Sequence, residues 1–267
     1  MRSLLGKASL GNAAWTLTKI YYTNKRASIS AGPLGVDFKT DGTKAFVLLG
    51  TSVLQYSLST AWDISTSSYD SVSVSIGGSR VDIAFKSDGV KMYVLGASGL
   101  GGLAVSQYSL TAWDLSTAAD DLVSLDVSGQ ITNPRGLAFK TDGTRAYIGG
   151  FTPAKIFQYS LSSAWDLSTA AYDSVSSPVL QGGGTGGLAF KTDGTKVFHF
   201  GSETGFVYQY TLSTAWDLST ASYDNVSFYV GTQSLGVAGL KIKSDGASLY
   251  IASAQNPPLA FVSQYSL

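Results

Sequence analysis

The sequence predicts an all-β fold, a five-bladed β-propeller with four antiparallel strands in each blade. Three observations predict it. The 267 residues include 30 glycines and many β-branched and aromatic side chains, with only 13% charged residues, a mixture that favours strands and tight turns. A unit of about 50 residues occurs five times, which is the size of a four-stranded blade. The array is also split between the two ends of the chain.

The first repeated element is FK-x-DG, an Asp-Gly dipeptide placed between two apolar runs. It begins at Phe38, Phe85, Phe139 and Phe190, and a variant, IKSDG, begins at Ile242. This pattern favours a hairpin, because glycine adopts a positive φ at little cost. A plain turn fits better than a Ca²⁺ loop, since the alternating oxygen ligands of such a loop are missing.

Two further elements follow in a constant order. QYSL or QYTL ends at Leu58, Leu110, Leu161, Leu212 and Leu267, and an element of the type AWDLSTASYDSVS follows the first four copies. In the fourth unit the first three strands are predicted near residues 187–192, 195–201 and 206–212. The last strand of each unit, as at residues 70–76, is predicted to follow a loop that contains the tryptophan.

The N-terminus supplies the fifth copy of the third element. The interval from Trp15 to Tyr22 matches that from Trp62 to Tyr69. We therefore expect residues 10–267 to form one closed domain, in which the segment 27–30 lies beside the strand that ends at Leu267. An open solenoid is the alternative fold, but it has no use for a split repeat. Residues 1–9 form an N-terminal extension.

Charge and composition exclude several classes of function. The formal net charge is zero and no run of like charges occurs, so the basic surface of a nucleic-acid binder is missing. There is no cysteine, which excludes disulfides, thiolate metal sites and a cysteine nucleophile. No segment has the apolar length of a signal peptide or a membrane helix. Neither a cofactor nor membrane insertion is predicted.

Thirteen of the 18 acidic residues occupy repeated positions, where a turn or loop role is more plausible than catalysis. Among the others, Asp37 and Asp82 fall in predicted first strands, which line the channel of a propeller. A carboxylate pair there would suit a glycosidase. Polar lining of the channel, with Lys241 as a partner, is the favoured interpretation, so no catalytic residue is assigned.

Three other features have both a functional and a structural explanation. His199 has no second histidine with which to bind a metal, and a satisfied, partly buried strand histidine is expected. The glycine-rich run 182–187 lacks the residues of a phosphate-binding loop and is interpreted as a flexible connection. The five tryptophans suit packing between blades better than sugar stacking, although a glycan-binding lectin stays open.

Loops that vary between units are expected on the face opposite the Asp-Gly turns. Because rigid scaffolds carry their binding residues on loops, this face is the predicted binding surface. Its candidate partner-binding residues are Arg80, Asn133, Arg135, Phe151, Lys155, Glu203, Phe206, Gln233 and Asn256.

The pattern FK-x-DG-T-K followed by QYSLSTAWDLSTASYDSVS resembles repeat arrays of bacteriophage and other prokaryotic β-propeller proteins, including tail-associated virion proteins. The resemblance covers about residues 10–267. It implies a non-enzymatic virion protein of a tail or head, located in an extracellular particle, whose partners are other virion proteins and a host receptor or glycan. The oligomeric state stays open.

Overall fold

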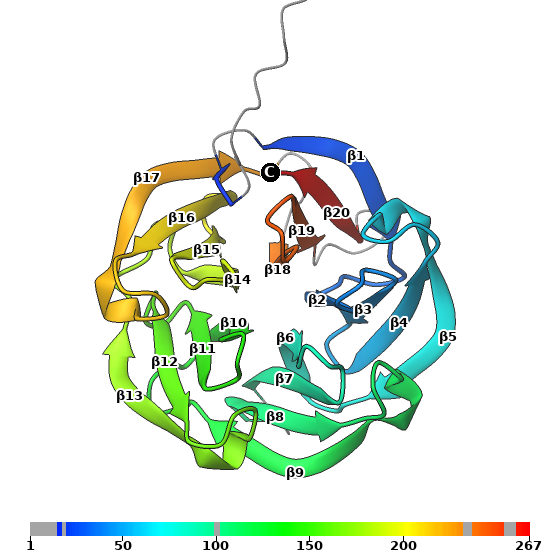
Figure 1. Cartoon of the computed structure of the whole chain (residues 1–267), viewed down its shortest axis with the longest axis horizontal. Helices are drawn as coiled ribbons and strands as arrows, with labels where there is room; N and C mark the ends of the chain where they lie inside the picture. The colour runs from blue at the N-terminus through cyan, green and yellow to red at the C-terminus, as the bar shows by residue number, and fades with distance from the viewer. Residues whose placement is uncertain (1–14, 18–19, 99–101, 232–236, 254–259) are drawn as a thin grey trace, which may run out of the picture.

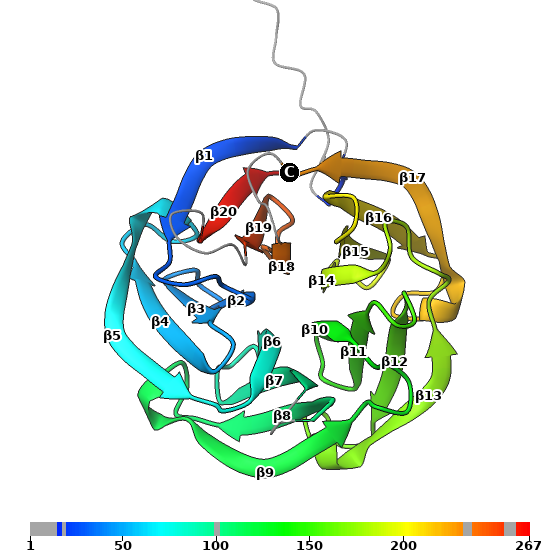
Figure 2. The same cartoon turned by 180° about the vertical axis from the view of Figure 1, so that it is seen from behind.

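The computed structural model consists of five four-stranded antiparallel sheets arranged in a ring, which confirms the predicted five-bladed propeller (Figure 1). The structure describes residues 15–17, 20–98, 102–231, 237–253 and 260–267. In every blade the first strand lies nearest the central axis and the fourth lies outermost. Seen from behind, the same order of strands runs outward in each blade (Figure 2).

The strands of each blade are as follows. Blade 1 comprises β2 (Gly35–Phe38), β3 (Lys44–Leu48), β4 (Ser52–Leu58) and β5 (Ser67–Ser75). Blade 2 comprises β6 (Ser79–Phe85), β7 (Lys91–Ser98), β8 (Ala104–Ser109) and β9 (Ala119–Asp126). Blade 3 comprises β10 (Pro134–Phe139), β11 (Arg145–Gly150), β12 (Ile156–Leu161) and β13 (Ala170–Ser176). Blade 4 comprises β14 (Thr185–Phe190), β15 (Lys196–Gly201), β16 (Phe206–Leu212) and β17 (Ala221–Tyr229). Blade 5 comprises β18 (Val237–Ile242), β19 (Ser248–Ser253), β20 (Phe261–Ser266) and β1 (Tyr21–Ser28).

The Trp-containing loop of blades 1–4 contains a short 3₁₀ helix. These helices are η2 (Ile64–Thr66), η4 (Leu115–Thr117), η5 (Leu167–Thr169) and η6 (Leu218–Thr220). The Asp of each Trp-Asp pair caps its helix; Asp63, for example, accepts hydrogen bonds from the backbone and side chain of Ser65, as an N-cap residue should. None of the helices in the described part of the chain is long and apolar enough to cross a membrane.

The fourth strand begins earlier than the sequence predicted. In blade 1 it starts at Ser67 rather than Asp70, and the register shifts opposite Gln55 and Tyr56. Two residues of the fourth strand, Asp70 and Ser71, lie between the partners of Tyr56 and Gln55 and form this β-bulge, and Ser71 has a φ of 60°. Period-two alternation is interrupted at such a bulge, which is why the sequence pattern hides the first part of the strand.

Aromatic side chains fill the junctions between neighbouring blades. At the junction of blades 3 and 4, Phe190 and Trp216 pack on Tyr147, with ring centroids 4.3 Å and 6.2 Å away. The hydroxyl of Tyr147 also donates a hydrogen bond to the carbonyl of Trp216 at 2.7 Å. Equivalent positions repeat around the ring, and each junction has its own buried apolar cluster. The apolar core is therefore divided among five junctions.

The glutamine of QYSL links each blade to the next. The side-chain oxygen of Gln55 accepts a hydrogen bond from the backbone N–H of Leu115 in blade 2 at 3.3 Å. Its side-chain nitrogen donates to Asp70 in its own blade at 2.8 Å. The side-chain amide of this glutamine thus provides an acceptor for a buried backbone N–H across the junction. Without an acceptor, that N–H would lower the stability of the fold.

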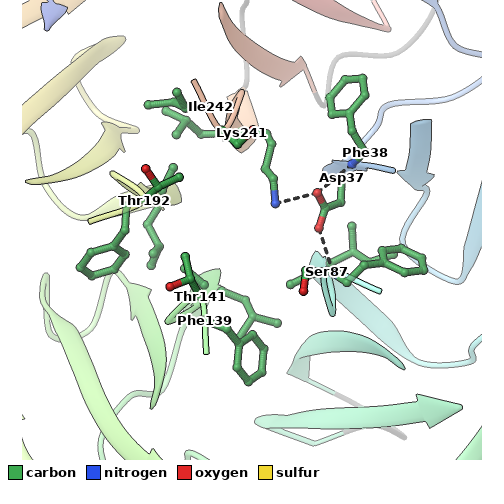
Figure 3. Close-up of a pocket in the computed structure, with 18 of the residues that line it drawn as sticks. Asp37, Phe38, Ser87, Phe139, Thr141, Thr192, Lys241 and Ile242 are labelled. Carbon is green, nitrogen blue, oxygen red and sulfur yellow. Dashed lines mark hydrogen bonds and ion pairs between the residues drawn. The ribbon is translucent and has the colours of Figure 1, made fainter. Parts of the chain in front are cut away.

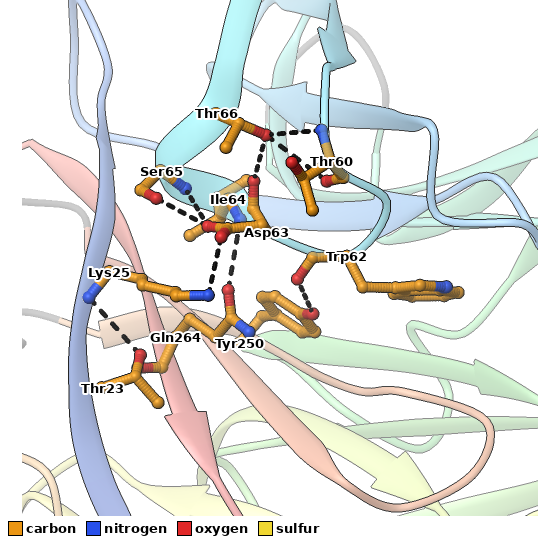
Figure 4. Close-up of polar contacts among 10 residues, drawn as sticks. All are labelled: Thr23, Lys25, Thr60, Trp62, Asp63, Ile64, Ser65, Thr66, Tyr250 and Gln264. Carbon is orange, nitrogen blue, oxygen red and sulfur yellow. Dashed lines mark hydrogen bonds and ion pairs between the residues drawn. The ribbon is translucent and has the colours of Figure 1, made fainter.

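The two ends of the chain close the ring as predicted. Strand β1 pairs with β20, and Ala27 lies opposite Val262. At the junction of blades 5 and 1, Gln264 accepts from the N–H of Ile64, as in the other blades (Figure 4). Lys25 of β1 forms an ion pair with Asp63 of blade 1 at 2.6 Å. The N-terminal strand is therefore tied to both blades.

Candidate functional site

The antiparallel topology separates two faces of the ring. Connections from the first strand to the second and from the third to the fourth, which hold the Asp-Gly turns and the Trp loops, lie on one face, here called the Trp face. The remaining connections lie on the opposite face, here called the loop face. The predicted partner-binding residues come from the connections of the loop face.

Three of those residues meet on blade 3. The guanidinium of Arg135 lies 5.5 Å from the centre of the Phe151 ring, a cation–π geometry. The side-chain nitrogen Nε of Arg135 donates to the side-chain oxygen of Asn133 at 3.1 Å. The backbone N–H of Phe151 donates to the carbonyl of Asn133, also at 3.1 Å. The guanidinium of a half-buried arginine thus lies over an aromatic ring.

Glu203 of blade 4 extends this group across the junction of blades 3 and 4. A side-chain atom added to Gly183 would lie 2.0 Å from the Glu203 carboxylate, and one added to Gly184 would lie 2.8 Å from the Phe151 ring. Both glycines have a positive φ, so no other residue type fits there easily. Asn133, Arg135, Phe151 and Glu203 are named the blade 3–4 patch.

The other candidates have different surroundings. Phe206 follows the turn that carries Glu203 and packs on Tyr229, 46% exposed, with ring centroids 5.0 Å apart. Lys155 lies in the same connection as Phe151. Arg80 is buried and donates to Gly77, Ser106 and Ile76, so its guanidinium serves the fold rather than the surface. Gln233 and Asn256 lie outside the described residues.

A cavity of about 260 Å³ lies on the axis, toward the Trp face (Figure 3). The first strands of all five blades line it. Its deeper wall includes Ala84, Ala138 and Ala189, with Asp37 and Lys241 at the corresponding positions of blades 1 and 5. The row nearest the mouth carries one hydroxyl side chain per blade: Thr40, Ser87, Thr141, Thr192 and Ser244.

Asp37 and Lys241 form an ion pair across the wall of the cavity, with Nζ 2.6 Å from a carboxylate oxygen. Asp37 is buried and also accepts hydrogen bonds from the N–H groups of Phe38 and Phe85, at 2.7 Å and 2.9 Å. The side chain of Lys241 is 37% exposed. The predicted partnership of these two residues is confirmed, and the lysine is its accessible member.

Asp82 occupies a row in which the other blades have glycine. Its oxygens accept hydrogen bonds from the N–H groups of Ile83 at 2.9 Å and Leu137 at 2.7 Å. Burial raises the pKa of Asp82 to about 8, against the lowering effect of these two N–H groups and of Lys241. Both predicted channel carboxylates therefore form hydrogen bonds that join neighbouring blades.

His199 differs from the expectation of a satisfied histidine. It is fully buried in β15, stacked on Tyr208 with ring centroids 5.3 Å apart, and neither ring nitrogen has a hydrogen-bond partner among the residues that the structure describes. Burial lowers the pKa of His199 to about 4. In the described part of the chain, no cluster of three or more metal-ligating side chains includes it or any other residue.

The tryptophan rings are packed between blades, as the sequence favoured. In blade 4, the Trp216 backbone donates to the carbonyl of Gly194, and a Cβ on that glycine would lie 2.3 Å from the indole ring. The Phe190 ring stacks on Trp216, with centroids 5.3 Å apart. A sugar therefore cannot lie flat on Trp216 without rearrangement of the junction.

Two features were missed by sequence reasoning although the repeats contain their signals. The residue between Lys and Asp of FK-x-DG is always Thr or Ser, which indicates the hydroxyl ring. The interval between the Gln of QYSL and the Asp of YD is 15 residues in three units and 14 in the second, and this near-constant spacing indicates their hydrogen bond. The blade 3–4 patch left no such signal, because its members are far apart in sequence.

No family model and no curated protein match the chain. Similar solved structures include a functionally unknown protein from Desulfotomaculum acetoxidans DSM 771, with a TM-score of 0.52, 10% identity and coverage of 85% of this chain. This chain spans 64% of that protein. Another, from Bacteroides uniformis ATCC 8492, is provisionally named a 6-phosphogluconolactonase and has a TM-score of 0.52 and 15% identity, covering 88% of this chain and 71% of its own. At these identities the likeness concerns the fold alone.

Proposed function

We propose that this propeller is a non-enzymatic binding scaffold, a structural or accessory protein of a virion that contacts a partner through its loop face. The observation that carries the proposal is the blade 3–4 patch. Its aromatic ring, arginine and carboxylate come from three separate segments of the chain. Arg and aromatic residues of this kind dominate binding energy at protein interfaces. The resemblance of the repeats to virion propellers supports the setting.

Glycoside hydrolysis is less well supported by the carboxylates of the cavity. A glycosidase needs one carboxyl group free to donate a proton and another free to attack or to activate water. The oxygens of Asp37 and Asp82 instead accept backbone N–H groups from their own blade and from the next one. A lectin that uses its tryptophans is disfavoured by the packing of Trp216 described above.

Two measurements test this function. Antibodies against the protein should label purified virus particles at one defined position, and mass spectrometry should find the protein in those particles. The double variant Arg135→Ala/Phe151→Ala should then lose incorporation into particles or attachment of particles to host cells.

Lys191→Ala is the matched control, because it removes a cationic side chain from the Trp face, where Lys191 pairs with Asp193. It should behave like the wild-type protein. Absence of the protein from particles would overturn the virion setting, and normal binding by the double variant would overturn the assignment to the loop face.

A further inference from the structure

We infer that the axial cavity on the Trp face is a second binding site, which takes a small hydroxylated organic anion with its acid group on Lys241. The site is separate from the blade 3–4 patch, which lies on the loop face. It goes beyond the proposed scaffold function, because a small ligand rather than a macromolecule would occupy it.

The charge of the ligand follows from which charged atoms are accessible. Three charged residues line the cavity: Asp37, Asp82 and Lys241. Both carboxylates are buried, 1% and 5% exposed, and their oxygens accept backbone N–H groups. Lys241 uses one donor on Asp37, while its side chain remains 37% exposed. Because an ammonium group has three donors, the cavity presents hydrogen-bond donors with positive charge to an incoming molecule.

The prediction that the ligand carries hydroxyl groups rests on the ring of Thr and Ser side chains at the mouth of the cavity. Thr40, Ser87, Thr141, Thr192 and Ser244 are all exposed, and none of their hydroxyls has a hydrogen bond to another described side chain or to the described backbone. Hydroxyls both donate and accept, so the ring matches the hydroxyl groups of a polyol. Five such side chains, one from each blade, line the same cavity.

The size of the ligand follows from the depth and volume of the cavity. Ser244 lies three residues beyond Lys241 along the same chain segment, so the hydroxyl ring is about 10 Å from the level of the lysine backbone. The row of lining side chains between these two levels is apolar: Phe38, Phe85, Phe139, Phe190 and Ile242. A volume of about 260 Å³ suits a short carbon chain, whose acid group would lie at Lys241 and whose hydroxyls would lie at the mouth; Figure 3 shows Lys241 and three of the hydroxyl residues around the cavity.

Three probes with one carbon skeleton test the charge requirement directly. Gluconate, glucitol and glucamine carry a terminal carboxylate, hydroxyl and ammonium group, respectively. The intrinsic fluorescence of the tryptophans that line the cavity, together with titration calorimetry, gives the affinity of each. We expect gluconate to bind at least about tenfold more tightly than either of the others, since a charge-assisted hydrogen bond is lost with them.

Variants of the cavity test the location. Lys241→Ala introduces the residue that blades 2, 3 and 4 have at this position, and should weaken gluconate binding at least about tenfold. Asp37→Ala/Lys241→Ala should do the same without leaving a buried carboxylate unpaired, which keeps the test valid where the single variant is unstable. Thr141→Val/Thr192→Val should weaken binding through the hydroxyl ring, and Lys191→Ala should leave it unchanged.

Glucitol or glucamine binding as tightly as gluconate would overturn the inference, as would wild-type affinity in a folded variant without Lys241. Failure of all three probes to bind at millimolar concentration would also overturn it for this ligand class. The virion proposal is unaffected by these outcomes, because its variants lie on the loop face.

Discussion

The Trp face and the loop face of the ring are built under different constraints. On the Trp face every blade has the same Asp-Gly turn and a tryptophan packed against a ring of the neighbouring blade, and blades 1–4 share the same capped 3₁₀ loop. On the loop face the connections differ in length and composition from blade to blade. The comparison teaches that the repeated contacts which hold the ring together lie on the Trp face, whereas the connections of the loop face can vary without loss of the fold. The axis is the exception, because Asp37, Asp82 and Lys241 break the repeat within the regular face.

The largest expected difference between the faces concerns two glycines with similar backbone angles. Gly194 of the Trp face has a φ of 75° and its Cβ would lie 2.3 Å from Trp216, whereas Gly77 of the loop face has a φ of 60° and nothing within 4 Å. Gly194→Ala should lower the free energy of unfolding by about 4 kcal/mol, because strain and overlap add.

Gly77→Ala should cost only about 1 kcal/mol, since strain alone remains. Urea denaturation measures both changes. Equal losses would show that the packing of the glycine under the indole ring contributes little to stability.

His199 should make stability depend on pH. The pKa of His199 is lowered to about 4 from 6.5, so the unfolded chain binds the proton more readily. The free energy of unfolding therefore keeps its full value above about pH 6.5 and decreases as the pH drops toward 4. The size of the pKa shift corresponds to a decrease of about 3 kcal/mol.

His199→Val introduces the residue found at Val47 and Val94 in blades 1 and 2, and should remove this dependence. The measurement is the difference in unfolding free energy between variant and wild type from pH 7 to pH 4, in which the titration of Asp82 cancels. A constant difference would mean that the imidazole gains a proton while buried.

The junction of blades 5 and 1, where the two chain ends meet, contains both a buried hydrogen bond and a partly exposed ion pair. Their contributions to stability can therefore be compared. Gln264→Ala should cost about 2 kcal/mol, because it leaves the buried N–H of Ile64 without an acceptor. Lys25→Ala should cost about 0.5 kcal/mol, because the Lys25 side chain is 42% exposed and its attraction to Asp63 is screened by water and salt. Thermal unfolding at low and high salt tests the pair, and only the lysine variant should lose its effect at high salt.

A small effect on stability is also expected from the blade 3–4 patch. Arg135→Ala removes a half-buried guanidinium from the Phe151 ring and should cost less than about 1 kcal/mol. Partner binding should nevertheless fall strongly if the patch is the interface. A large loss of stability in urea denaturation would instead assign Arg135 a structural role like that of Arg80.

The repeated features of the fold were predictable because each is local. FK-x-DG specifies a turn through adjacent residues, and the matching of Trp15 with Trp62 predicted that β1 completes blade 5. The bulge at Ser71 was missed because it breaks the alternation on which strand prediction depends. The burial of His199 without a hydrogen bond to a described residue was missed because its surroundings come from other strands, as with Tyr208 and Tyr210 of β16.

The candidate sites were predictable only in part, for the same reason. Comparison of the repeats identified the loop face and the pairing of Asp37 with Lys241. It did not show that Arg80 is buried, or that Arg135 and Glu203 belong to one patch across a junction.

The sequence alone determined the number of blades, the order of strands and the closure of the ring, because these depend on patterns that recur at a constant interval. Only the tertiary structure decided which charged groups of the axis are accessible and which hydroxyl side chains line one cavity. The burial of these groups and the distances between them arise only when the five first strands come together around the axis. No spacing between residues along the chain predicts those distances.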